Sequence, residues 1–369
     1  VLLSRLSDIK NGIIIFAEDP GSADFLSPII KLLIKKKYHV NLVGKRLAKS
    51  IFIDNNFNKF MLPENISIND LFNDMHPSII ISGTSTNKKS ICYSAIIEAK
   101  KYNIPSIGAI DAPMGAIKRF SKGNEKLYFE PNWIIVPNEW CKGRFENLGV
   151  ETSKIKIFGN PRILDLKEAA SKMQKESLDL KIKKSLNIQD RHIFVTVFID
   201  AEVDDNPYKK DSSWTLQGRG NENKRTNIVL EDLIDTCSPN RKNLHLNLRI
   251  HPKNSLGQFS KYLKYFDSYT SSFSSLEMVF ASDIVIGMTS TILVDSFILG
   301  KKTISVIPRP MEMDWLDICR NKLINCYYKK ENLIDMWKKI SKKKYKALKN
   351  NNKYSDEFNK DKFYSFINN

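Results

Sequence analysis

The sequence predicts an α/β protein of two domains, each a doubly wound parallel sheet, which face each other across a cleft. The chain of 369 residues is long enough for two domains with separate cores. Short apolar runs alternate with helical patterns along most of the chain, which is typical of parallel sheets. This alternation begins again after a charged connection. We therefore place an N-terminal domain at 1–165, a linker at 166–190, a second domain at 191–330, and an amphipathic helix with a basic tail at 331–369.

The first domain opens with an apolar run at 12–17, bounded by turn residues as in a buried parallel strand. A tight turn at 18–22 and a helical pattern up to Lys37 complete a strand, loop and helix. The same pattern predicts further strands at 40–43, 78–82, 105–110, 133–136 and 155–158, and helices at 67–75, 88–102 and 138–148.

The second domain repeats this pattern after the linker. It predicts strands at 193–199, 244–250, 284–287 and 303–306, and helices near 227–237, 256–265 and 290–299. A polar stretch at 200–226 shows little periodicity, and a loop of that length is either functional or disordered. The chain closes with a helix from Glu331 and a tail rich in Lys and Asn, which we expect to fray.

The composition indicates a soluble, cytoplasmic protein. Hydrophobic residues make up 42% and charged residues 27%. No apolar run approaches the ~20 residues of a membrane-spanning helix, and no signal peptide is visible. Five cysteines without CxxC spacing argue against a disulfide framework or a structural zinc site, so we predict reduced thiols.

The net charge of +17 raises the alternative of a basic RNA- or membrane-binding scaffold without catalysis. The basic residues are 46 Lys and only 12 Arg, whereas nucleic-acid readers rely on Arg, so we predict no nucleic-acid partner. The apolar face of 25–37 precedes Lys35, Lys36 and Lys37. It fits either core packing or contact with an anionic membrane surface, which would make the protein peripheral on the inner face.

Two segments of the second domain predict a nucleotide-phosphate site. Arg249, His251 and Pro252 lie at the end of one strand, where a His-Pro step either donates to a phosphate or simply forms a turn. Thr289, Ser290 and Thr291 lie where the next strand gives way to a helix, so they cap that helix, bind an anion, or both. Asp295, one helical turn further, is our candidate for the ribose hydroxyls.

The carboxyl edge of the first sheet supplies the candidate catalytic groups. Glu18 and Asp19 follow the first strand and are candidate general bases, although acids in a first helical turn also complement the helix dipole. Asp111, at the end of the strand at 105–110, is their rival. The residues that contact an acceptor or cap their helices are predicted to be Gly21, Thr84 and Ser85.

Other polar residues complete the predicted site. Arg219 and Arg225 are candidates for the donor phosphate. Asn160 and Arg162 form a hinge turn from which Arg162 reaches into the cleft. The acidic segment 200–205 either binds a divalent cation or is solvated. We predict no metal and no cofactor.

These segments resemble nucleotide-sugar enzymes of the two-Rossmann-domain GT-B fold. The resemblance runs from Gly12 to about Val306 and includes four further pieces in the same order as in that group. The pieces are Val136-Pro137-Asn138-Glu139-Trp140, Leu148-Gly149-Val150, Ile155 to Pro161, and Ala281 to Gly287 continuing to Gly300-Lys301-Lys302. Similar orders occur in polysaccharide-type glycosyltransferases, bacterial sialyltransferases, CDP-glycerol glycerophosphotransferases and non-hydrolysing UDP-N-acetylglucosamine 2-epimerases.

The resemblance implies that His251, Ser290 and Thr291 hold the nucleotide phosphate. It implies a metal-independent glycosyltransferase of surface glycan biosynthesis, which uses a nucleotide sugar and a glycan or lipid-linked acceptor. Transfer of a CDP-linked polyol phosphate is an alternative, but it needs an acceptor-side histidine, and only His39 and His76 stand in the first domain. A 2-epimerase or nucleotide-sugar hydrolase is a further alternative. Epimerase-like enzymes carry a Gly-Gly pair and two acids where this chain has Ser290, Thr291 and the single acid Asp295.

Overall fold

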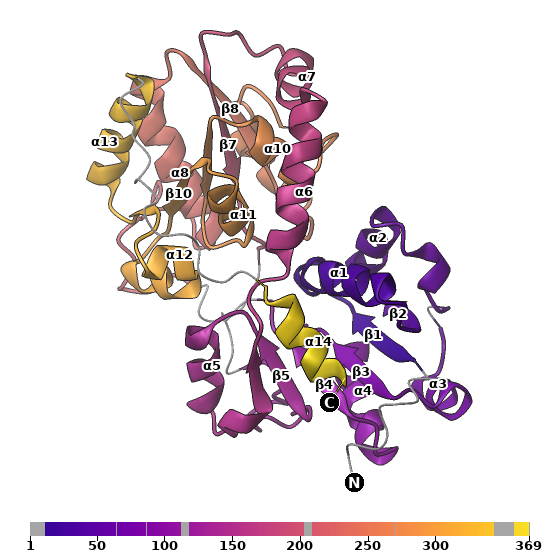
Figure 1. The fold of residues 1–369 in the computed structure, drawn as a ribbon. Helices are drawn as coiled ribbons and strands as arrows, with labels where there is room; N and C mark the ends of the chain where they lie inside the picture. Colours follow the sequence, from indigo (N-terminus) through magenta and orange to yellow (C-terminus); the bar gives the residue numbers. More distant parts are fainter. Residues whose placement is uncertain are drawn as a thin grey trace. The chain divides into compact units, whose positions relative to one another are not determined.

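The computed structural model describes residues 12–63, 65–85, 87–111, 118–202, 209–269, 271–342 and 358–368. They form two compact units (Figure 1). The N-terminal unit runs to Asp165 and includes the last helix of the chain, and the C-terminal unit begins at Leu166.

The N-terminal unit contains a six-stranded, wholly parallel sheet of order β2-β1-β3-β4-β5-β6. Its strands are β1 (Ile13–Ala17), β2 (Val40–Gly44), β3 (Ile79–Ser82), β4 (Ser106–Ala109), β5 (Trp133–Val136) and β6 (Ile155–Ile157). Its helices are α1 (Pro20–Lys35), α2 (Leu47–Asp54), α3 (Ile68–Met75), α4 (Ile91–Lys101), α5 (Glu139–Glu146) and α14 (Lys360–Asn368), with short 3-10 turns at Asn58–Phe60 and Thr152–Lys154. Helix α6 (Arg162–Lys175) crosses the boundary between the units.

Strand β1 shows how this sheet is covered on both faces. Ile13 and Ile15 belong to a buried cluster with residues of α1, α2 and α14, whereas Ile14 and Phe16 belong to another with residues of α3, α4 and α5. Because side chains alternate along a strand, an unbroken apolar run is what a strand buried on both faces requires.

The C-terminal unit contains a five-stranded parallel sheet of order β11-β10-β9-β7-β8. Its strands are β7 (Ile193–Phe198), β8 (Leu244–Arg249), β9 (Ile284–Gly287), β10 (Lys302–Val306) and β11 (Asn325–Tyr327). Its helices are α7 (Leu178–Ser185), α8 (Arg225–Cys237), α9 (Ser260–Leu263), α10 (Ser275–Ala281), α11 (Ile292–Ile298), α12 (Asp317–Arg320) and α13 (Lys330–Ser341). Shorter 3-10 turns lie at Ser238–Asn240, Leu256–Phe259 and Pro310–Trp315.

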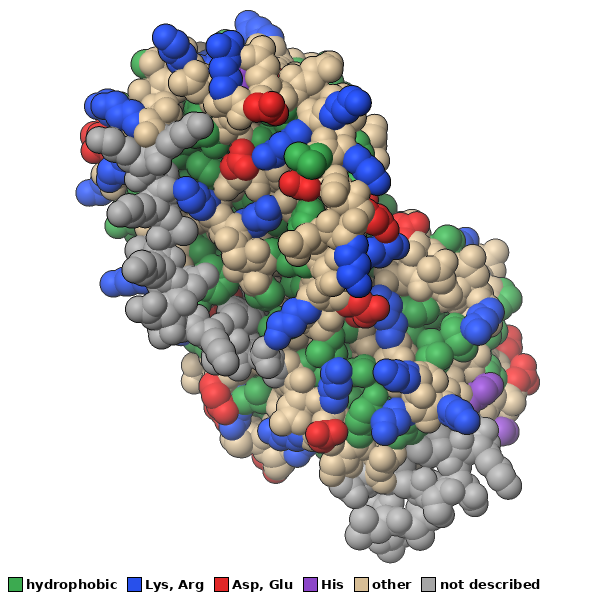
Figure 2. Space-filling model, turned by 45° about the horizontal axis from the view of Figure 1, so that its top comes forward, with side chains coloured by type: hydrophobic (Ala, Val, Ile, Leu, Met, Phe, Trp, Pro, Cys, Tyr) green, Lys and Arg blue, Asp and Glu red, His purple; other side chains and the backbone are tan. Residues whose placement is uncertain are grey.

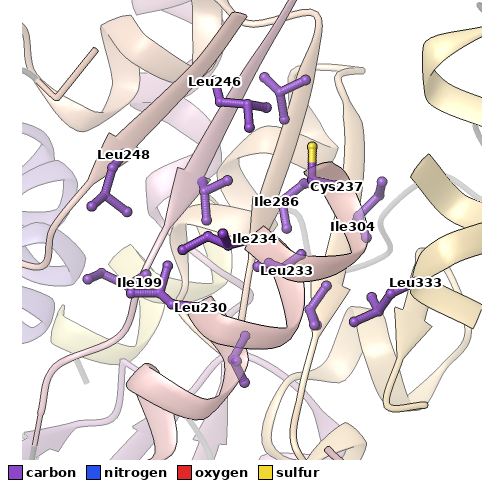
Figure 3. Packing of buried hydrophobic residues seen from close by; sticks show 14 of the residues in the cluster. Ile199, Leu230, Leu233, Ile234, Cys237, Leu246, Leu248, Ile286, Ile304 and Leu333 are labelled. Carbon is purple, nitrogen blue, oxygen red and sulfur yellow. The ribbon is translucent and has the colours of Figure 1, made fainter. Parts of the chain in front are cut away.

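Helix α8 packs on the sheet of the C-terminal unit through its apolar face. Leu230, Leu233 and Ile234 share a buried cluster with strand residues such as Leu246 and Ile286 (Figure 3). Leu333 of α13 belongs to the same cluster. Full burial of one such side chain stabilises the fold by about 1.5–3 kcal/mol.

Both sheets have the same strand order, because β8-β7-β9-β10-β11 repeats the order β2-β1-β3-β4-β5. In such sheets the strand order reverses between the first and third strands, and ligands bind outside the carboxyl ends of the strands at this point. The candidate edges are therefore the ends of β1 and β3 in one unit and of β7 and β9 in the other. These are two doubly wound, Rossmann-like α/β domains, as the sequence predicts.

The structure corrects the expectation of a frayed C-terminal tail for residues 358–368. They form α14 and its approach, whose Phe358, Phe363 and Ile367 are buried in the core of the N-terminal unit. Phe363 meets Phe158 edge to face, with ring centroids 5.5 Å apart. The yellow helix in Figure 1 therefore belongs to the N-terminal unit.

Three further expectations are refined. The apolar face of α1 lies in the core of the N-terminal unit, so the alternative that this face touches a membrane is wrong. Part of the polar stretch at 200–226 is packed, since Trp214 and Leu216 are buried. The predicted helix near 256–265 is a 3-10 turn followed by the short α9.

Among the described residues, no helix combines the length and apolar character needed to cross a membrane. On the face shown in Figure 2, Lys and Arg side chains are scattered and mixed with acidic ones.

Candidate functional site

Hydrogen bonds join the two loops at the strand-order reversal of the N-terminal unit. The Ser22 hydroxyl donates to the Thr84 carbonyl at 2.6 Å and accepts from the Thr84 N–H at 3.1 Å. A Cβ at Gly83 would lie 2.6 Å from Cβ of Ser22, so only glycine allows this approach. The loops after β1 and β3 are thus fixed against each other.

Glu18 supports this edge. It is 3% exposed and accepts hydrogen bonds from the Asn87 side-chain amide at 2.8 Å and from the Ile91 N–H at 3.2 Å. Arg46 Nε lies 3.2 Å from Oε1. Since Ile91 begins α4, this carboxylate satisfies an otherwise unpaired N–H of the first helical turn. Among the predicted bases, Asp19 and Asp111 are more exposed to solvent than Glu18.

Asp19 is the N-cap of α1, and its half-buried side chain makes no capping hydrogen bond. Asp111 follows β4, and its side chain is 16% exposed. Its Oδ1 is buried and accepts no hydrogen bond from the described residues, although Arg119 Nη2 lies 3.5 Å away. Buried polar atoms nearly always have a hydrogen-bond partner, so this carboxylate oxygen keeps an unused acceptor position.

Asp111 also faces α1. A Cβ at Gly21 would lie 2.3 Å from Asp111 Oδ2, so the absent side chain of Gly21 makes room for the carboxylate. Arg119 donates to the Thr84 hydroxyl and lies near Asp111, and so it joins the ends of β3 and β4. Sequence reasoning missed Arg119, because no strand end or motif marks it.

The predicted acceptor and hinge residues mostly stabilise their own loops. Thr84 and Ser85 are buried, and the Ser85 backbone exchanges hydrogen bonds with the Tyr93 hydroxyl. Asn160 accepts from the Arg162 N–H at 3.1 Å and so forms a turn. Arg162 Nη1 lies 3.5 Å from Asp24 Oδ2. Burial raises the pKa of Asp24, Arg162 opposes this shift, and the charge of Asp111 adds to it.

In the C-terminal unit, His251 lies directly after β8 and Ile250. Its Nδ1 accepts the Lys253 N–H at 3.0 Å, which places the proton of the neutral ring on Nε2. The half-buried ring therefore carries its proton on Nε2, and the exposed Pro252 stiffens the turn. Arg249 ends β8, and burial lowers its pKa although Glu277 opposes the shift.

The hydroxyl segment lies at the end of β9, as predicted. Thr289 is buried, whereas Ser290 and Thr291 are half-buried and precede α11, with Thr291 as the N-cap. Asp295 is one turn inside α11 and only 2% exposed. Its predicted contact with a ribose therefore requires the carboxylate to become accessible.

Carboxylates bind both arginines that the sequence predicts to contact the donor phosphate. Arg219 forms a two-pronged ion pair with Asp235, with Nη2 2.6 Å from Oδ1. Arg225 is 3% exposed and binds Glu312 and Asp200. Burial alone would lower the pKa of Arg225, but the two carboxylates raise it above its ordinary value. Both guanidinium groups are committed to carboxylates.

The acidic segment is described only in part. Asp200 accepts three hydrogen bonds through Oδ2, and Glu202 is half-buried, whereas Asp204 and Asp205 lie outside the described residues. Within the described part of the chain, no three His, Cys, Asp or Glu residues are grouped to hold a metal ion.

The architecture defines the class of the protein. Two Rossmann-like domains with parallel sheets, one after the other along the chain, are characteristic of the GT-B fold. The sequence matches no protein-family model and no curated protein.

Solved structures share this fold across nearly the whole chain. The UDP-GlcNAc 2-epimerase of Methanocaldococcus jannaschii matches with a TM-score of 0.63 and 14% identity over 96% of this chain and 99% of its own. The UDP-GlcNAc 2-epimerase of Neisseria meningitidis, solved with bound UDP-GlcNAc, matches with a TM-score of 0.61 and 12% identity over 97% and 94%. The UDP-N-acetylglucosamine 2-epimerase of Rickettsia bellii matches with a TM-score of 0.57 and 13% identity over 96% and 93%. At such identities these likenesses establish the fold.

Proposed function

We propose that the protein is a glycosyltransferase that moves a sugar from a nucleotide-activated donor to a hydroxyl acceptor in surface glycan biosynthesis. The observation that carries this proposal is His251, held as an Nε2–H donor at the end of β8. The hydroxyl segment Thr289 to Thr291 follows the end of β9 in the same sheet. Together they suit the diphosphate of a nucleotide sugar, the kind of molecule that the Neisseria epimerase binds.

The chemistry divides between donor binding and proton removal. His251 and the hydroxyl segment would stabilise the negative charge that develops on the leaving phosphate. In the N-terminal unit, Asp111 or Asp19 would take the proton from the acceptor hydroxyl. We favour Asp111, because its buried Oδ1 lacks a hydrogen bond from the described residues and so suits a hydroxyl donor.

The acceptor is proposed to be a glycan or a lipid-linked saccharide. Lys35, Lys36 and Lys37 at the end of α1 are exposed, which supports the proposal of an anionic membrane partner. Such a surface would be bound through the charge of the lysines and not through the apolar face of α1. A cytoplasmic location and independence from metals belong to the same proposal.

Titration calorimetry with UDP, CDP, GDP and CMP tests the donor half of the proposal. We expect one nucleoside diphosphate to bind, and His251→Ala to weaken its binding about tenfold or more, since a hydrogen bond to a charged group contributes about 1.5–3 kcal/mol. His192→Ala is the matched control. His192 directly precedes β7, so it lies at the amino ends of the strands, away from the carboxyl ends where we place the nucleotide. If no nucleotide binds the wild-type protein, the proposal fails.

A nucleotide-sugar 2-epimerase is the second candidate, and the fold likeness to three such enzymes favours it. Proton NMR of the nucleotide sugar separates the two reactions. An epimerase inverts the sugar at C2 without an acceptor, whereas a transferase leaves C2 unchanged and releases free nucleotide when the acceptor is added.

A further inference from the structure

Asp200 links the strand ends at the reversal of the C-terminal sheet. Its Oδ2 accepts from the Thr289 N–H at 3.1 Å and from the Thr289 hydroxyl at 2.7 Å. Arg225 Nη1 donates to the same oxygen at 2.8 Å. Because Asp200 follows β7 and Thr289 follows β9, this one carboxylate fixes the start of the hydroxyl segment to the neighbouring strand end.

The main chain of Asp200 holds the histidine turn as well. The Asn254 side-chain amide donates to the Asp200 carbonyl at 2.9 Å and accepts the Glu202 N–H at 2.9 Å. The Asn254 N–H donates to the His251 carbonyl at 2.9 Å, which closes the turn that carries the ring. Asp200 therefore connects both segments to which we assign the nucleotide. Its side chain binds Thr289, and its main-chain carbonyl binds Asn254 in the His251 turn.

A buried ionic network anchors Asp200. Arg225 donates to Glu312 Oε2 through Nε at 2.7 Å and Nη2 at 2.5 Å, and Arg309 donates to Oε1 at 3.1 Å. Glu312 is fully buried, and the Trp315 ring lies 5.2 Å from the Arg225 guanidinium centre. Such a network has few alternative arrangements, because each buried charge needs its partners.

In the N-terminal unit, the corresponding two loops are joined without a charged side chain. At the equivalent strand reversal, the neutral Ser22 hydroxyl bridges to Thr84. The charged bridge in the C-terminal unit instead leaves Asp200 Oδ1 buried without a hydrogen bond in the described structure. Costly burial of a carboxylate at a ligand-binding edge indicates a role in ligand geometry.

We infer that Asp200, anchored by Arg225 and Glu312, is a positioning residue that sets the geometry of the Thr289 and His251 segments for the nucleotide diphosphate. This inference rests on the proposed function, since it assumes that these segments hold a nucleotide. In this inference Arg225 holds the Asp200 carboxylate in place and does not itself bind the phosphate.

The experiment uses the full chain, the tightest-binding nucleoside diphosphate among UDP, CDP and GDP, and the matching nucleoside. Asp200→Asn keeps the side-chain shape and one accepting oxygen, but it removes the negative charge that pairs with Arg225 and strengthens the hydrogen bonds from Thr289. We expect the affinity for the diphosphate to fall about tenfold or more, while that for the nucleoside changes less than about twofold. A general loss of structure would lower both affinities alike.

Asp211→Asn is the matched control. Asp211 belongs to the same network through Arg309, at 2.9 Å, but its side chain is 52% exposed, and within the described part of the chain it makes no hydrogen bond to either nucleotide segment, so affinity should not change.

Asn254→Ala is a second, milder variant, which releases the His251 turn without removing a buried charge. It should weaken diphosphate binding with little change in melting temperature, and it decides the question if Asp200→Asn does not fold. Wild-type affinity for the diphosphate in a folded Asp200→Asn protein, or in Asn254→Ala if that variant alone folds, overturns the inference. If the wild-type protein binds no nucleotide, the proposed function itself falls.

Discussion

Replacement of Gly21 by alanine should lower the rate of sugar transfer while it raises the free energy of unfolding. Gly21 lies in the first turn of α1, where its backbone conformation suits any residue. The new methyl group would lie 2.3 Å from Asp111 Oδ2, and ordinary contact begins at 3.4 Å. The Asp111 carboxylate must therefore retreat by about 1 Å.

The two consequences have opposite signs. Alanine in place of a helical glycine raises the free energy of unfolding by up to about 0.5–1 kcal/mol. The displaced atoms are the tip of one side chain, which moves at little cost. If Asp111 is the general base, however, a displacement of about 1 Å lowers the transfer rate roughly 10²-fold.

The assay is the rate of sugar transfer, with the donor that calorimetry identifies, beside urea unfolding of the same preparation. Gly143→Ala is the matched control, because Gly143 lies in α5 and a Cβ there meets no atom within 4 Å. It should stabilise to a similar degree and leave the rate unchanged. A Gly21→Ala protein with the wild-type transfer rate would refute the role of Asp111.

Three further predictions concern stability. Glu312→Gln leaves Arg225 and Arg309 short of a buried partner and should lower the free energy of unfolding by about 3–5 kcal/mol in urea titrations; an unchanged midpoint would contradict this. Phe363→Ala should cost about 3–5 kcal/mol in the N-terminal unit and spare nucleotide binding, whereas a loss below about 1 kcal/mol would show that α14 contributes little. Burial lowers the pKa of His245 from 6.5, so the unfolded chain binds a proton at higher pH than the folded one, and stability should fall as pH drops below about 6.5. His245→Asn should remove this decline, and an equal decline in the variant would count against the explanation.

Most of the strands and many helices follow from local patterns. The strands β1, β7 and β9 are apolar runs bounded by turn residues, and a parallel strand buried on both faces needs such a run. Helices α2, α10 and α12 and strand β11 escaped prediction. The periodicity of α2 is weak over eight residues, and β11 has three half-buried residues at a sheet edge.

The site was predictable to the extent that it lies at strand ends. His251 and Thr289 could be placed from the strand pattern alone. Arg119, Asp24, Asn254 and Glu312 could not, since each reaches the site through contacts distant in sequence; Glu312 meets Arg225 across 87 positions. No local rule marks such a pair.

The sequence by itself determined the two alternating α/β series and the strand ends that carry polar residues, because periodicity and turn chemistry are local properties. The tertiary structure decided which of these polar groups satisfy one another. Arg225, Glu18 and Asp200 have the chemistry of ligand-binding groups, yet buried charges must find partners, and folding brought those partners to them. It also decided that the C-terminal residues complete the first unit, because only the assembled sheet offers Phe363 an apolar surface to cover.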